Sequence, residues 1–157
     1  MRCLMVVDSY NWALHNRAVN LRDRIKDINF DILYFRDCKD NFDNYDIVYL
    51  LNWPIYGYVK DKIKKNRKYR LITSVSSHIG RKNAKYMIQM FNLFDAISCS
   101  NMFLFKEFKH SGINSDIFYT PFGVNTDVFF NKKEFREPRL FGWVGNLKRN
   151  VKRFPII

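Results

Sequence analysis

The chain has 157 residues, 47% of them hydrophobic, which predicts one globular domain with a core that needs neither disulfides nor a metal. Its formal net charge of +12 resides in two stretches, 60–70 and 132–153, each with a net charge of +6. No apolar run reaches the roughly 20 residues of a membrane-spanning helix, and the N-terminal run is too short for a signal-peptide core. These values exclude an integral membrane protein and favour a cytoplasmic one.

The three cysteines, Cys3, Cys38 and Cys99, are odd in number and far apart in the sequence. They form no Cys-x-x-Cys pair, so the pattern predicts neither a disulfide framework nor a zinc site. A reducing compartment and a protein without a bound metal follow from this spacing.

Strands are expected to alternate with helices along the first part of the chain. Short apolar runs predict six strands, at 3–8, 30–35, 45–52, 70–77, 95–100 and 116–122. Apolar residues at helical spacing predict helices around 14–25, 55–66, 83–94 and 102–110, the last with Asn101 as its N-cap. This alternation predicts a Rossmann-like α/β domain over residues 1–131, a parallel sheet with helices on both faces.

A new unit is expected after this sheet. The charged segment 132–139, which contains a proline, reads as an inter-domain linker, and the apolar run 140–144 as another strand. An apolar strand without neighbours would be an exposed edge that invites aggregation. We therefore expect 140–157 to be the truncated start of a second α/β domain.

The first candidate site lies at the carboxyl ends of the strands, where open parallel sheets bind ligands. Hydroxyl, amide, carboxylate and indole groups follow four of the predicted strands and suit a polyhydroxylated ligand such as a sugar. The candidates for acceptor binding are Asp8, Tyr10, Asn11, Trp12, Asn52, Trp53, Ser77 and Asn101. Each residue taken singly also has an ordinary reading as a turn or cap. His78 is the titratable candidate for catalysis, because it directly follows a strand, whereas His15 and His110 are expected on helices.

The second candidate site follows the predicted strand at 140–144. Glycine permits a close backbone approach, a helix N-terminus offers free N–H groups, and basic side chains neutralise phosphate oxygens. The candidates for binding a donor phosphate are Gly145, Asn146, Arg149 and Lys152. Two glycines do not make the complete dinucleotide-binding fingerprint, so this motif alone has low specificity.

The order DIFYTPFGVNTDVF, a charged linker, and LFGWVGNLKRNVKRF resembles the inter-domain crossing of GT-B glycosyltransferases of family four. The matching residues are Pro121, Gly123, Val124 and Phe129 in the first part and Gly142, Gly145 and Lys152 in the second. Asn125 and Asn146 depart from the pattern, which has Asp and Arg at these places.

This resemblance implies a retaining transfer of sugar from a nucleotide-sugar donor to an acceptor hydroxyl, in surface glycan synthesis, without metal or cofactor. The first domain would hold a glycan or lipid-linked acceptor, His78 would lie near the reaction centre, and Lys152 would hold the donor diphosphate. The family's later Glu-x7-Glu pair does not occur before Ile157. We therefore expect an N-terminal portion that is inactive alone, or one that is completed by a second chain.

Two alternatives stay open. The basic stretches could bind nucleic acid or an acidic membrane surface through phosphates. Aromatic residues are not interleaved with the basic ones in 60–70, so no nucleic acid is expected, whereas peripheral contact with the inner membrane face agrees with a lipid-linked acceptor. The other alternative is a truncated remnant that folds without catalysing a reaction.

Overall fold

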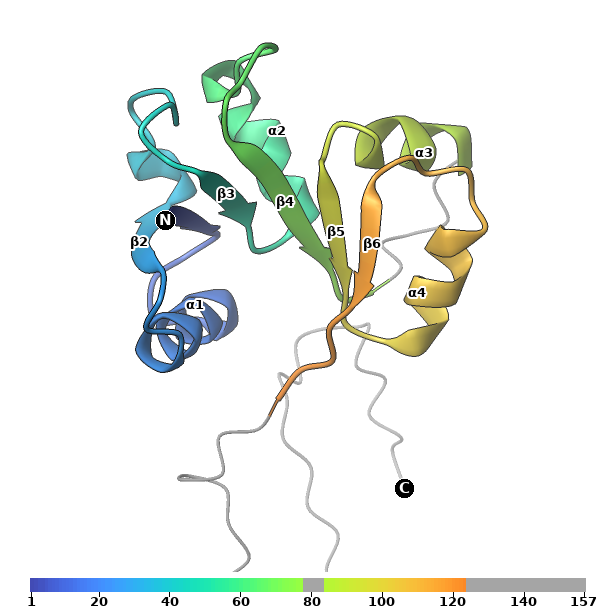
Figure 1. Cartoon of the computed structure of the whole chain (residues 1–157), viewed down its shortest axis with the longest axis horizontal. Helices are drawn as coiled ribbons and strands as arrows, with labels where there is room; N and C mark the ends of the chain where they lie inside the picture. The colour runs from blue at the N-terminus through green and yellow to red at the C-terminus, as the bar shows by residue number, and fades with distance from the viewer. Residues whose placement is uncertain (78–83, 124–157) are drawn as a thin grey trace, which may run out of the picture. The chain divides into compact units, whose positions relative to one another are not determined.

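A computed structural model describes residues 1–77 and 84–123 (Figure 1). The chain divides into two units, Met1–Phe122 and Gly123–Ile157, and the described residues belong to the first apart from Gly123. The strands are β1 (Arg2–Val7), β2 (Asn29–Tyr34), β3 (Ile47–Leu50), β4 (Arg70–Val75), β5 (Ala96–Cys99) and β6 (Asp116–Tyr119). The α-helices are α1 (Ala13–Arg24), α2 (Tyr56–Val59), α3 (Ala84–Phe91) and α4 (Met102–Lys109). Three short 3₁₀ helices are η1 (Phe35–Asp37), η2 (Trp53–Ile55) and η3 (Lys60–Lys62).

The six strands form one sheet in the order β2-β1-β3-β4-β5-β6, and every neighbouring pair is parallel. In the register of the central strand, Met5 of β1 pairs with Ile32 of β2 and Tyr49 of β3. The predicted parallel α/β sheet is therefore confirmed. The strand order reverses at β1, because β2 and β3 lie on its two sides.

Apolar residues cover both faces of the sheet centre. On one face Leu4, Leu50 and Leu71 pack with side chains of α2, α3 and α4, among them Phe91. On the other face Met5 packs with Ala18 of α1. The apolar character of β1 throughout its length follows, since residues on both sides of this strand are fully buried.

The direction of the crossover connections explains this division of the helices. A connection between parallel strands is right-handed, so helices whose strands step in opposite directions along the sheet lie on opposite faces. Only α1 belongs to a step from β1 toward β2; α2, α3 and α4 belong to steps toward β6. Among the described residues, α1 is consequently the one helix on its face.

The predicted helix over 55–66 is wrong in its second half. The α-helix ends at Val59, a 3₁₀ turn covers Lys60–Lys62, and Ile63 is extended. Gly57 has low helix propensity, and lysines four residues apart, such as Lys60 and Lys64, repel each other on one helix face. The strands predicted at 45–52 and 116–122 are also longer than β3 and β6.

The expected linker at 132–139 and the expected domain start at 140–157 lie outside the described residues. Within 1–77 and 84–123, no helix has the length and apolar character that crossing a bilayer demands.

Candidate functional site

The carboxyl ends of β1 and β3 are the position where this topology places a ligand. The strand order reverses there, so the connections after β1 and β3 leave toward opposite faces and separate. The segments that border this edge are the 8–12 loop after β1 and the Asn52–Trp53 turn after β3. Four of the predicted acceptor-binding residues stand in the first of these segments and two in the second.

Two buried polar atoms near this edge have no hydrogen-bond partner among the described residues. They are Oδ1 of Asp8, directly after β1, and Nδ1 of His15, in the first turn of α1. Buried polar atoms in folded proteins are nearly always paired, with protein or with ordered water. The carboxylate oxygen and the imidazole nitrogen therefore have hydrogen-bonding capacity that the described residues do not use.

The Tyr10 side chain attaches the loop to the end of β2. Its hydroxyl donates to Oδ2 of Asp37 (3.1 Å) and accepts from the backbone N–H of Tyr34 (3.3 Å). Its ring lies edge-on to the His15 ring, with the centroids 5.4 Å apart. Tyr10 therefore positions the loop and orients His15, while its hydroxyl is already engaged.

Asn11 and Trp12 turn the chain from β1 into α1. Asn11 has a φ of 56°, in the left-handed region that asparagine tolerates better than most residues. Trp12 is extended at the N-cap position, where its carbonyl accepts from Asn16 N–H, and its side chain is 58% exposed. An exposed indole beside unpaired polar atoms is suited to stacking on the apolar face of a sugar ring.

The two residues after β3 have different surroundings. Trp53 is 6% exposed and packs edge-on against Phe91, with ring centroids 5.9 Å apart. Its indole ring therefore fills the core and offers little surface to a ligand. Asn52 is partly buried, and its carbonyl accepts from Ile55 N–H to open the 3₁₀ turn.

Asn101 is the N-cap of α4, as the sequence predicts. Its Oδ1 accepts from Leu104 N–H at 2.9 Å, and its Nδ2 donates to the carbonyl of Ser76 at 3.4 Å. This side chain therefore joins the carboxyl ends of β4 and β5. Ser77, one residue further along the β4 segment, is exposed.

The remaining predicted site residues lie outside the described residues. They are the catalytic candidate His78 and the phosphate-binding candidates Gly145, Asn146, Arg149 and Lys152. The candidate site consists of Asp8 and His15, with the Tyr10 ring against His15 and the exposed Trp12 in the same connection between β1 and α1. His15 received little weight in the sequence, because a histidine on a helix gives no local signal that its ring nitrogen is buried and unpaired.

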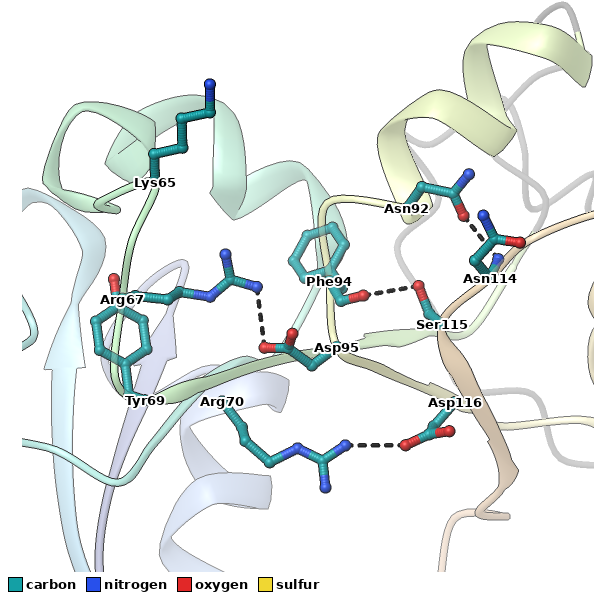
Figure 2. A pocket seen from close by; sticks show the side chains of 10 residues that line it. All are labelled: Lys65, Arg67, Tyr69, Arg70, Asn92, Phe94, Asp95, Asn114, Ser115 and Asp116. Atoms are coloured by element: carbon teal, nitrogen blue, oxygen red, sulfur yellow. Dashed lines mark hydrogen bonds and ion pairs between the residues drawn. The ribbon is translucent and has the colours of Figure 1, made fainter.

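A polar cavity of about 560 Å³ lies at the opposite, amino edge of the sheet (Figure 2). Two ion pairs cross it: Arg67 to Asp95 and Arg70 to Asp116, each at 2.9 Å. Asp95 also accepts from Leu71 N–H at 2.6 Å. Because both carboxylates are paired with arginines, we interpret this cavity as a structural feature in which ion pairs connect β4, β5 and β6. The sequence contains no periodic signal for these long-range pairs.

The thiols are not nucleophiles. Burial raises the pKa of Cys3 to about 12 and the pKa values of Cys38 and Cys99 to about 11. A thiol with so high a pKa stays protonated and unreactive near neutral pH. In the described part of the chain, no cluster of three or more His, Cys, Asp or Glu side chains is arranged to hold a metal ion.

Comparison of the chain with protein-family models, curated proteins and solved structures found no match.

Proposed function

We propose that Met1–Phe122 is the acceptor-binding domain of a GT-B glycosyltransferase, and that Asp8, His15 and Trp12 hold a sugar unit of the acceptor. The observation that carries the proposal is the pair of buried, unpaired polar atoms at the carboxyl edge, Asp8 Oδ1 and His15 Nδ1. The strand reversal at β1 and the exposed indole of Trp12 support it.

Each residue has a distinct role in this proposal. The Asp8 carboxylate accepts a hydrogen bond from a sugar hydroxyl, which is stronger than a bond between neutral groups. His15 Nδ1 meets a second hydroxyl, and Tyr10 fixes the orientation of its ring. Trp12 stacks on the C–H face of the sugar and shields these hydrogen bonds from water.

The reaction follows from the sequence resemblance in 116–154. A nucleotide sugar is the donor, a hydroxyl of a glycan or lipid-linked glycan is the acceptor, and the anomeric configuration is retained. Gly145, Asn146, Arg149 and Lys152 bind the donor diphosphate, and His78 acts beside the transferred sugar.

Saturation-transfer NMR with the methyl glycosides of glucose, galactose, mannose and N-acetylglucosamine tests the sugar site. We expect saturation of the ring protons of at least one glycoside. Asp8→Asn should weaken binding by about tenfold, the loss of one charge-assisted hydrogen bond. Trp12→Ala should remove the signal on the C–H face.

Phe103→Ala is the matched control, because Phe103 is an exposed aromatic (70%) on α4, distant in the topology from the β1 edge. This variant should bind the glycoside as the original chain does. Equal binding by Asp8→Asn, Trp12→Ala and the original chain would refute the site. Binding of uridine diphosphate that Lys152→Ala abolishes, with glycoside binding unchanged, would separate the donor site from the acceptor site.

A further inference from the structure

An apolar groove of about 410 Å³ lies on the α1 face of the sheet, over β4, β5 and β6. Figure 1 shows α1 beside β2, at the other end of the sheet from β6. The groove lining includes Tyr49, Ile72, Ala96 and Phe118, with Arg17 of α1 at one side. Phe118 is 54% exposed, although it sits on a strand of the central sheet.

The strand register gives this surface the form of a trough. One row across the sheet runs from Ser74 through Ser98 to Phe118, and the neighbouring row places Ile72 beside Ala96. Ala96 and Ser98 on β5 therefore form a low floor, Ile72 on β4 lies beside them, and Phe118 forms the wall on β6. A floor of small residues allows the backbone of a packed helix to come close.

The topology explains why the trough is open. Parallel sheets normally have both faces covered by helices. All the connections from β3 to β6 place their helices on the opposite face, so among the described residues α1 is the one helix on this face, and it packs on the β1 side. At about 4.8 Å per strand, the three spacings from β3 to β6 span about 14 Å, enough for one helix about 10–12 Å wide.

Arg17 gives the trough a charge preference. Its guanidinium donates to Ser74 Oγ (3.1 Å) and Tyr49 Oη (2.9 Å), and it lies 4.9 Å from the centroid of the Phe122 ring. All these partners are neutral, and the group is partly buried. A cation at the rim of an apolar groove favours an occupant with a carboxylate at that place.

We propose that this trough binds an amphipathic α-helix of another protein, with its apolar stripe on Ile72, Ala96 and Phe118 and an acidic side chain against Arg17. The positive charge of this chain favours an occupant from another protein over a segment or a second copy of the same chain. Residues 124–157 carry eight basic and three acidic side chains, and a second copy of the chain has a net charge of +12. The surface differs from the edge at Asp8, so the proposal does not depend on sugar binding.

Two fluorescent helical peptides of about five turns test the proposal by anisotropy with the full chain. Both carry a Leu and Ile stripe; one has glutamates along the flank of the stripe and the other has lysines. We expect the glutamate peptide to bind about tenfold more tightly, as one charge-assisted contact provides. Arg17→Glu should reverse this preference, and Arg17→Met should abolish it while both peptides still bind.

Phe118→Ala should weaken both peptides, whereas Phe103→Ala, which removes a more exposed aromatic from α4, should leave both unchanged. Circular dichroism of each variant checks folding. Equal affinity of the two peptides for the original chain would overturn the proposal, as would failure of the glutamate peptide to bind. Sedimentation as a dimer that Phe118→Ala dissociates would identify a second copy as the occupant and would also overturn it.

Discussion

The cysteine thiols show how burial alone changes the chemistry of a residue. Cys3 is 3% and Cys99 0% exposed, and each contributes to the packing of a sheet face. Desolvation disfavours the thiolate, so the pKa of each thiol is raised from its ordinary value near 9. These residues therefore act as small apolar side chains whose ionisation is coupled to unfolding.

The coupling predicts a loss of stability at alkaline pH. Below about pH 9 the thiols are protonated in both states, whereas above it the unfolded chain releases protons that the folded chain retains. The free energy of unfolding should therefore fall as pH rises from about 9 to 11, by up to about 1.4 kcal/mol per pH unit per thiol. Urea unfolding across this range measures it. Cys99→Ala should reduce the slope; an unchanged slope would assign the loss to tyrosine or lysine ionisation.

Single residues also show how much of the candidate site can be predicted from the sequence. Trp53 and Trp12 both follow strands and read alike, yet one lies in the core and the other is exposed. The difference arises from the Phe91 ring on α3, far along the chain, which no local pattern discloses. No local pattern shows that the His15 ring nitrogen is buried without a hydrogen-bond partner among the described residues, because its surroundings depend on the folded loop.

At the scale of elements, local pattern predicts regular structure and fails where charge and glycine intervene. The six strands and three of the helices were predicted from apolar runs and spacing, because those elements bury one face or two. The lysine-rich second half of the 55–66 helix has no such face. Its departure from helix follows from side-chain repulsion and a glycine, which periodicity does not weigh.

The Asn101 cap yields a prediction at this scale. Asn101→Ala removes the acceptor for Leu104 N–H and should lower the free energy of unfolding by about 1 kcal/mol. Asn101→Asp retains the acceptor and is the matched control, with little loss expected. Urea unfolding at neutral pH distinguishes them, and an equal loss for both would assign the effect to the Nδ2 bond to Ser76 instead.

The ion pairs at the amino edge of the sheet give another prediction. Asp95→Ala deprives Leu71 N–H and Arg67 of their acceptor and should cost about 1–3 kcal/mol, since it leaves a buried donor unpaired. Asp116→Ala breaks a pair whose side chains are 61% and 60% exposed and should cost about 0–1 kcal/mol. If urea unfolding finds the two variants equally stable, the buried N–H is satisfied in another way.

At the scale of the molecule, fewer basic side chains are free to contact an anionic surface than the net charge suggests. Within 60–70, Lys64 pairs with Asp43, Arg67 with Asp95 and Arg70 with Asp116. Lys60, Lys65 and Lys68 are exposed, whereas Lys62 is half-buried and donates to the carbonyl of Lys39. Any contact of this segment with a membrane surface therefore depends on a few lysines, each worth about 1 kcal/mol near anionic lipid.

Vesicle sedimentation measures this contact. The full chain should co-sediment with phosphatidylserine vesicles at low salt and much less at high salt. Lys65→Glu with Lys68→Glu should weaken co-sedimentation more than Lys106→Glu with Lys109→Glu on α4, which makes the same charge change at a different surface. Equal losses from the two pairs would mean that total charge, and not this segment, controls binding.

The strand order also dictates how the sheet can be assembled. β1, at the start of the chain, lies inside the sheet between β2 and β3, and after β3 each new strand joins the outer edge in order of synthesis. During translation the growing domain can therefore add one strand at a time to an existing template, with no need to thread a late strand between earlier ones. Until β6 joins, each outermost strand in turn is a temporary open edge, so the nascent chain is most prone to mispairing at β4 and β5.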